Sequence, residues 1–159
     1  EFGKSGDRKR EGSGVKEYEK RAYITIENFS EEDESGTSVF TIEGIYAGRG
    51  NLHTLQYEEN DASGMKGTTT RVTFKQGSAS LVRKGAVNSV IQFYPGKIES
   101  SYYETPYGAI LMEVETKHVS FINEPGGCRG RISYKMTFGG DVARGENKDM
   151  RIRVIFLED

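Results

Sequence analysis

Apolar and polar residues alternate with a period of two along most of this chain, from residue 21 almost to its end. In the run at residues 131–138, for example, Ile132, Tyr134, Met136 and Phe138 alternate with charged and hydroxyl-bearing residues. β-branched and aromatic residues dominate such runs, as they do on pleated surfaces with one buried face. No segment carries an apolar stripe at helical spacing. The pattern therefore predicts about ten strands and no helix.

Short segments rich in glycine, proline and acidic residues separate these runs, and such segments are typical of turns. Strands that are apolar on one face belong to antiparallel sheets, because parallel strands need helical crossovers. An open sheet of this size would leave long unpaired edges, and closure removes them. We therefore predict an all-β fold, a single antiparallel, largely up-and-down β-barrel of about 8–10 strands, with a closed β-sandwich as the alternative.

A hairpin is predicted where the sequence reads SYYETPYGAILMEVETKHVSFI, residues 101–122. Pro106 sets φ for a turn and Gly108 follows where the chain re-enters a strand, so residues 105–108 should form the tip. In the long strand that follows, the apolar positions change from one face to the other. This change of phase predicts a bulge or bend near residues 117–120.

The first twenty residues are charged and glycine-rich, and their apolar residues are isolated. Such a segment buries too little apolar surface to offset the conformational entropy that it loses on ordering. We therefore predict a flexible charged tail at residues 1–20, either native or in part a cloning remnant. The remainder, residues 21–159, has the length of one barrel domain.

The composition argues against several classes of protein. Lys plus Arg number 22 and Asp plus Glu number 24, and the formal net charge of −2 gives no general attraction to nucleic acid or anionic lipid. No apolar run approaches the length of a membrane span. The single cysteine, Cys128, cannot form an internal disulfide, and it fits the cytoplasm at least as well as secretion.

Three segments of the chain resemble a known family: YEENDASGMKGTTTRVTF, SLVRKG and GKIESSYYETPYGAILMEVETKHV. The most specific part is YxTPYG at residues 103–108, and the likeness runs from about Tyr23 to the C-terminus. In order and spacing these residues resemble the YwiB-like family of uncharacterised bacterial proteins. The resemblance implies a calycin- or lipocalin-like closed barrel in the cytoplasm of a Gram-positive bacterium, and it implies no activity. The chain has no tryptophan and hence no calycin Gly-x-Trp, so the likeness to lipocalins is one of architecture.

Two histidines and the cysteine are the candidates for metal binding or nucleophilic catalysis. His53 and His118 both lie in predicted strands, and neither they nor Cys128 show the local spacing of metal ligands. Cys128 and His118 could form a nucleophile–base pair, but no orienting third group accompanies them. The glycine-rich segments match no nucleotide-binding motif. We therefore predict strand histidines, a free thiol at the start of a strand, no metal, no cofactor and no enzymatic activity.

Basic residues of the last two strands lie two or four apart within each strand, so that each set occupies one face. These residues are Arg129, Arg131, Lys135, Arg151 and Arg153. We expect acids on neighbouring strands, such as Glu43 or Glu113, to neutralise this stripe. The alternative is a phosphate-bearing ligand or RNA, although no aromatic residues share the basic face as they do in single-strand binders.

Aromatic residues gather around two predicted turns, at residues 94–97 and 105–108. If both turns lie at one barrel mouth, the rings either line the rim of a pocket or plug the barrel. The candidate ligand-binding residues of the mouth and lumen are Phe93, Tyr102, Tyr103, Tyr107, Met112, His118 and Tyr134. A hollow barrel would have a cavity lined by residues such as Tyr46, Phe74, Ile91, Phe93, Met112, Tyr134 and Phe156.

The function favoured by this sequence is non-enzymatic binding of a small apolar or amphipathic molecule between the walls of the barrel. The alternative is a structural or protein-interaction module with a filled barrel, for which a homodimer is an expected form. Neither reading requires a membrane or a nucleic acid as partner.

Overall fold

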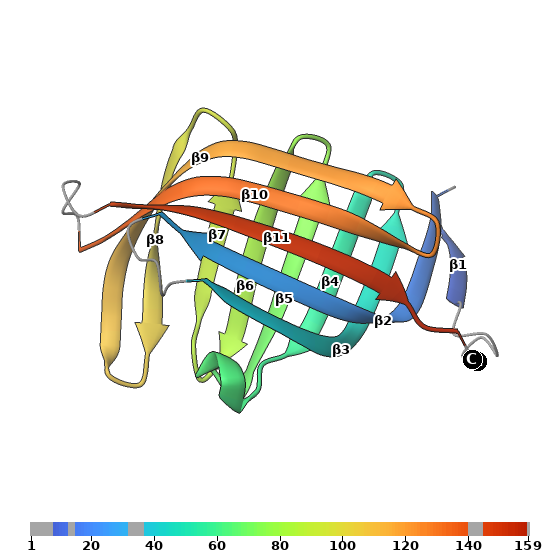
Figure 1. The fold of residues 1–159 in the computed structure, drawn as a ribbon, viewed down its shortest axis with the longest axis horizontal. Helices are drawn as coiled ribbons and strands as arrows, with labels where there is room; N and C mark the ends of the chain where they lie inside the picture. Colours follow the sequence, from blue (N-terminus) through green and yellow to red (C-terminus); the bar gives the residue numbers. More distant parts are fainter. Residues whose placement is uncertain (1–7, 13–14, 32–36, 140–144, 159) are drawn as a thin grey trace.

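The computed structural model describes residues 8–12, 15–31, 37–139 and 145–158, most of which belong to β-strands (Figure 1). One short 3-10 helix, η2 at Asp61–Ser63, lies between β4 and β5. The strands are β1 Arg8–Gly12, β2 Val15–Ser30, β3 Ser38–Arg49, β4 Leu52–Glu58, β5 Thr68–Lys75, β6 Ser78–Gly85, β7 Ser89–Phe93, β8 Ile98–Thr105, β9 Gly108–Glu124, β10 Gly127–Phe138 and β11 Glu146–Phe156.

These strands form one antiparallel sheet that bends into a nearly closed barrel (Figure 1). Its order is β7-β6-β5-β4-β3-β2-β11-β10-β9-β8, and β1 pairs with β2 outside this path. Neighbours in the path are consecutive along the chain except β2 and β11, whose pairing connects the two ends of the described chain. The predicted antiparallel, largely up-and-down barrel is therefore confirmed, and the sandwich is not what forms.

The two outermost strands, β7 and β8, meet through a single bridge. The N–H of Asn88 donates to the carbonyl oxygen of Glu104, and the N–H of Glu104 donates to that of Asn88, both at 2.9 Å. Every other neighbouring pair of strands in the path shares a ladder of at least five residue pairs. We call this weakly paired line of closure the β7–β8 seam.

Alternate residues of each strand point into the barrel, as the period of two predicts. In β5, for example, Thr68, Thr70, Val72 and Phe74 are buried, and the residues between them are half-buried or exposed. Burial of one such aliphatic or aromatic side chain contributes roughly 1.5–3 kcal/mol to folding. The alternation that identifies the strands in the sequence is therefore also what fills the interior.

Strand β9 contains the predicted bulge. His118 lies opposite Ser133 of β10 while Thr116 lies opposite Tyr134, so that Lys117 is the extra residue. The extra residue exchanges the inner and outer faces of β9 beyond this point. His118 is therefore exposed, although two residues earlier Thr116 is buried.

The hairpin tip at residues 105–108 is also confirmed. Thr105 pairs with Gly108 across the β8–β9 turn, and the backbone N–H of Tyr107 donates to the Thr105 hydroxyl at 3.1 Å. Gly108 has φ +132°, which a residue with a side chain adopts only under strain. Tyr107 is 98% exposed, so its ring contributes nothing to the core.

The chain differs from the prediction at its N-terminal end. Residues 1–7 and 13–14 of the predicted tail lie outside the described residues. The rest is extended, since β1 pairs with the first part of β2, and β2 pairs with β3 from Glu17 onward. Backbone pairing along β3 requires no apolar side chains, so a segment of charged and glycine-rich composition can still form a strand.

Candidate functional site

One end of the barrel interior is filled by aromatic rings that come from five strands, β3, β4, β5, β9 and β11. The His53 ring stacks on Phe121 with ring centroids 4.1 Å apart, and Phe121 lies 5.3 Å from Phe74. Tyr46 lies 5.0 Å from Phe156 and donates or accepts a 2.9 Å hydrogen bond at Nδ1 of His53. We call these five residues the aromatic plug. Tyr46, Phe74 and Phe156, which the sequence predicted to line a cavity, each contact another aromatic ring of this plug.

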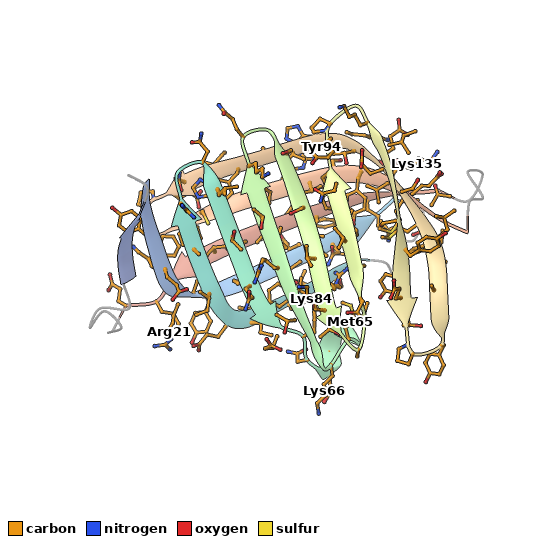
Figure 2. The ribbon with its side chains drawn as sticks, turned by 180° about the vertical axis from the view of Figure 1, so that it is seen from behind. Arg21, Met65, Lys66, Lys84, Tyr94 and Lys135 are labelled. Carbon is orange, nitrogen blue, oxygen red and sulfur yellow. The ribbon has the colours of Figure 1, made fainter. Side chains whose placement is uncertain are left out.

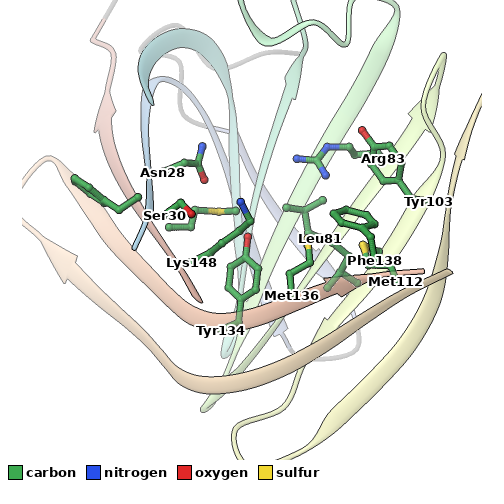
Figure 3. A pocket seen from close by; sticks show the side chains of 13 residues that line it. Asn28, Ser30, Leu81, Arg83, Tyr103, Met112, Tyr134, Met136, Phe138 and Lys148 are labelled. Carbon is green, nitrogen blue, oxygen red and sulfur yellow. The ribbon is translucent and has the colours of Figure 1, made fainter. Parts of the chain in front are cut away.

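The other end of the interior is hollow and contains a cavity of about 370 Å³, which we call the mouth cavity (Figure 3). Part of its wall is formed by the end of β2 and the start of β11. Its lining residues are Asn28, Phe29, Ser30, Leu81, Arg83, Ile91, Tyr103, Met112, Tyr134, Met136, Phe138, Lys148 and Met150. A second cavity of about 350 Å³, the side cavity, adjoins it and shares Asn28, Arg83 and Met150.

The methionines of the chain gather at these two cavities. The sequence contains four, of which Met112, Met136 and Met150 line the mouth cavity and Met65 lines the side cavity. Methionine has three rotatable bonds and a polarisable thioether, and it adapts to apolar partners of different shape. The lining is therefore suited to an apolar group whose outline is not fixed in advance.

Two cationic side chains and no carboxylate line the mouth cavity. Figure 3 shows the guanidinium of Arg83 extending from β6 toward Asn28 on the facing wall. Lys148 projects inward from β11 and forms an ion pair with Glu146, Nζ to Oε2, at 3.2 Å. The charged groups that face the cavity are therefore cationic, while the carboxylates paired with them, Glu59 and Glu146, lie outside its lining.

Arg83 has a buried carboxylate on its far side. The Glu59 side chain is 1% exposed, and its Oε2 accepts a 2.5 Å hydrogen bond from the Thr70 hydroxyl. Nε of Arg83 lies 4.0 Å from the same oxygen, and among the described residues Nε and Glu59 Oε1 have no hydrogen-bond partner. Burial, and after it the Glu59 carboxylate, raises the pKa of Tyr57, which lines the side cavity with Glu59.

The predicted site residues separate into two groups. Tyr103, Met112 and Tyr134 come together in the mouth cavity, and Phe93 lies behind it, fully buried, with its ring 5.1 Å from Tyr134. Tyr134 is itself buried, and burial raises its pKa to about 12. Three of the predicted residues lie outside the cavity: Tyr102, Tyr107 and His118.

Each of these three has a local reason for facing outward. Tyr102 occupies an outward position in the alternation of β8 and is 58% exposed. Tyr107 lies at the hairpin tip, and the bulge at Lys117 moves His118 to the outer face. The two aromatic turns do not share a mouth either, because residues 94–97 precede β8 and residues 105–108 follow it. The strand between them places them at opposite ends.

The two histidines and the cysteine lie in different surroundings. His53 belongs to the aromatic plug, where burial lowers its pKa. His118 is exposed, and it lies opposite a residue five positions along β10 from Cys128. Cys128 is a free, buried thiol at the start of β10, and burial, followed by the charge of Glu124, raises its pKa to about 12. Among the described residues, no three His, Cys, Asp or Glu side chains gather as a metal site would require.

Sequence reasoning missed several lining residues. Leu81, Arg83, Met136 and Met150 occupy inward positions of alternating strands, and the alternation identifies such positions. A charged residue at an inward position was the available signal for Arg83, and the same holds for Lys148. The four methionines of the sequence, three of which line the mouth cavity, were a second available signal.

None of the described residues forms a helix with the length and apolar character of a membrane span.

Comparisons with known proteins give a family and a fold. A family model described as a domain of unknown function, DUF1934, matches residues 24–152. The crystal structure of the ywiB protein from Bacillus subtilis is 23% identical to this chain and matches it with a TM-score of 0.73. The match covers 87% of this chain and 93% of that one, and it shows a shared fold. No curated protein matches.

Proposed function

We propose a function from the geometry of the cavity, because the chain belongs to the DUF1934 family, a domain of unknown function. The match also confirms the resemblance to the YwiB-like family. The proposed function is non-enzymatic binding of a small amphipathic molecule with an anionic head group. The observation that carries it is the mouth cavity, whose lining combines three methionines and two cations with no carboxylate.

The apolar part of the ligand would lie among the thioethers. Leu81, Ile91 and Met112 form an apolar side of the cavity, and they are at most 4% exposed to solvent. Pockets for small molecules have volumes of roughly 300–1,000 Å³, and the mouth cavity, at about 370 Å³, suits a short chain or a compact ring. Removal of that apolar surface from water would supply most of the binding free energy.

The head group of the ligand would lie at Arg83. A guanidinium carries five N–H donors, and no hydrogen bond from Arg83 is formed within the described residues. The ion pair with Glu59 holds the Nε side of Arg83, so the terminal nitrogens are the ones available to the cavity. Charge-assisted bonds to a carboxylate or phosphate are about twice as strong as neutral ones.

Native mass spectrometry of the freshly purified protein, beside a denatured aliquot, is the first test. We expect a non-covalent mass that is lost on denaturation. Because the proposed function is non-enzymatic, the released molecule should be recovered chemically unchanged after incubation with the protein. A bare monomer that binds no amphiphile would contradict the proposal. A bare dimer would instead support the alternative of a protein-interaction module.

A head-group series tests the chemistry of the site. Decanoate, decanol and decylammonium share one chain and differ in charge, and isothermal titration calorimetry compares their affinities. We expect decanoate to bind roughly tenfold or more tightly than decanol, and decylammonium to bind most weakly. Equal affinities for all three would show that Arg83 does not bind the head group of the ligand, and would contradict the proposal.

The Arg83→Gln variant should lose most of the preference for decanoate and keep its affinity for decanol. Lys84→Gln is the matched control, since Lys84 is the next residue of β6 and is exposed. Because Arg83→Gln leaves Glu59 buried without its cation, the variant is compared with Glu59→Gln/Arg83→Gln, which removes both charges. Preference for decanoate in both variants would show that Lys148 or another group holds the head.

A cytoplasmic location is part of the same proposal. It is supported by the resemblance and by the free, buried thiol of Cys128, which fits a reducing compartment. Fractionation of cells that express the full-length protein tests it.

A further inference from the structure

A groove of about 530 Å³ on the outer wall of the barrel gathers four arginines. The register of β10 and β11 places Arg129 directly opposite Arg153, and Arg131 directly opposite Arg151. All four side chains are exposed, and the strands that carry them cross the near side of the barrel in Figure 1. We call this surface the arginine groove. Its other lining residues are Thr25, Glu27, Ser120, Ile122, Gly130 and Ile152.

One end of the arginine groove is neutralised by acids. Asp149 accepts two hydrogen bonds from Arg131, at 3.1 and 2.9 Å, and one from Arg151 at 3.2 Å. Glu27, the one carboxylate in the lining, lies opposite Arg151 on β2. Glu43 and Glu113, which the sequence predicted to neutralise the arginines, lie elsewhere. Glu43 pairs with Arg21 at 3.0 Å, and Glu113 lies opposite Thr137.

The other end of the arginine groove keeps an excess of positive charge. Arg129 pairs with Glu124 at 2.9 Å, and no ion pair of Arg153 is found among the described residues. The neighbours across the sheet at this level are Ile122 of β9 and Thr25 of β2, which carry no charge. Two arginines therefore lie side by side, and Glu124, on the far side of Arg129 from Arg153, is the one carboxylate paired with them among the described residues.

A directly opposed pair of like charges destabilises a sheet. An anion that binds both guanidinium groups removes that repulsion, and the planar fork of arginine matches the oxygens of phosphate in a bidentate manner. The net charge of the chain is −2, so this local excess is not a consequence of a generally basic protein.

We propose that the Arg129–Arg153 end of the arginine groove binds a small phosphate-bearing anion. The site lies on the outer face, whereas the mouth cavity lies inside the barrel, and it does not depend on the function proposed above. A long nucleic acid is disfavoured because Glu27 lies further along the groove and Asp149 binds the next pair of arginines, so that both carboxylates would repel its next phosphates.

Titration with inorganic pyrophosphate at constant ionic strength, followed by calorimetry, tests this proposal. We expect saturable binding of one equivalent, and Arg153→Gln and Arg129→Gln should each weaken it by roughly tenfold or more. Arg21→Gln is the matched control, because Arg21 is an exposed arginine of β2 that is paired with Glu43. These surface substitutions are expected to leave the fold intact.

Three results would overturn the proposal. Absence of saturable pyrophosphate binding is the first, and equal weakening by Arg21→Gln, which indicates a general charge effect, is the second. The third is a single-stranded RNA oligomer that binds at least tenfold more tightly than pyrophosphate and loses affinity in Arg153→Gln, because the groove would then be a nucleic-acid surface. The Arg83→Gln variant should bind pyrophosphate as the unchanged protein does, so failure here and failure of the mouth cavity are distinguishable.

Discussion

Individual residues inside the barrel stay neutral because burial removes the water that would solvate a charge. Burial raises the pKa of Cys128, of Tyr46 and of Tyr134, each to about 12, and the Glu124 carboxylate adds to the effect at Cys128. In an unfolded chain these groups titrate near pH 9 to 10. The difference between the two states makes folding stability depend on alkaline pH.

The free energy of unfolding is expected to fall as the pH rises. Between about pH 9 and 12 the unfolded chain loses protons that the folded chain keeps, so the free energy of unfolding decreases by a few kcal/mol. Urea unfolding at pH 8 to 11 measures the slope, and Cys128→Ala should make it shallower. A stability that is flat over this range, or a native thiol that reacts with iodoacetamide as fast as an unfolded one, would contradict the prediction.

At the scale of the element, small features of β9 and β10 decide which side chains reach the interior. The change of apolar phase in the sequence was sufficient to predict the bulge at Lys117, because phase is a local property of a strand. It was not sufficient to place His118, since the exact residue of the bulge depends on pairing with β10. Tyr102 and Tyr103, adjacent in β8, differ in whether they reach the cavity because successive residues of a strand point to opposite faces of the sheet.

A glycine in β10 is required by a ring from the other side of the barrel. A Cβ at Gly130 would overlap the ring of Phe74, which is fully buried in β5. We expect Gly130→Ala to lower the free energy of unfolding by about 1–3 kcal/mol, because the overpacked ring must move. Urea unfolding measures this loss.

A smaller partner should relieve the overlap at Gly130. Gly130→Ala/Phe74→Leu should be more stable than the sum of the two single changes predicts, by at least about 0.5 kcal/mol. Additive effects in this double-mutant cycle would show that the two residues do not interact.

At the scale of the whole molecule, the barrel combines a filled end with a hollow end beside its weakest line of closure. Ile91 of β7 and Tyr103 of β8 line the mouth cavity from the two sides of the β7–β8 seam. Only the bridge between Asn88 and Glu104 joins these strands. Local opening of the seam would therefore give a ligand access to the cavity.

Hydrogen exchange should report this opening. The amides of Asn88 and Glu104 are expected to exchange at least about tenfold faster than those of the β10–β11 ladder, because a single bridge opens without global unfolding. Decanoate in the mouth cavity contacts both sides of the seam and should slow exchange at these two amides. Mass spectrometry or NMR measures both effects. Uniform protection around the barrel would contradict the expected opening.

The sequence by itself determined the strands from residue 21 onward, the antiparallel barrel architecture, the turn at residues 105–108 and the bulge region. These depend on period-two alternation and on turn residues, which act over a few neighbours. Tyr103, Met112 and Tyr134 were also among the residues predicted for the mouth and lumen, but Tyr102, which the alternation of β8 places outside, was predicted with them.

Only the tertiary structure decided which end of the barrel is filled and which is hollow. The aromatic plug joins His53 and Phe74 to Phe121 across the barrel, and the mouth cavity joins Arg83 of β6 to Lys148 of β11. Contacts of this kind depend on register and closure, which are set by all strands together. The opposition of Arg129 and Arg153 has the same origin, since each strand alone shows only that its arginines share a face.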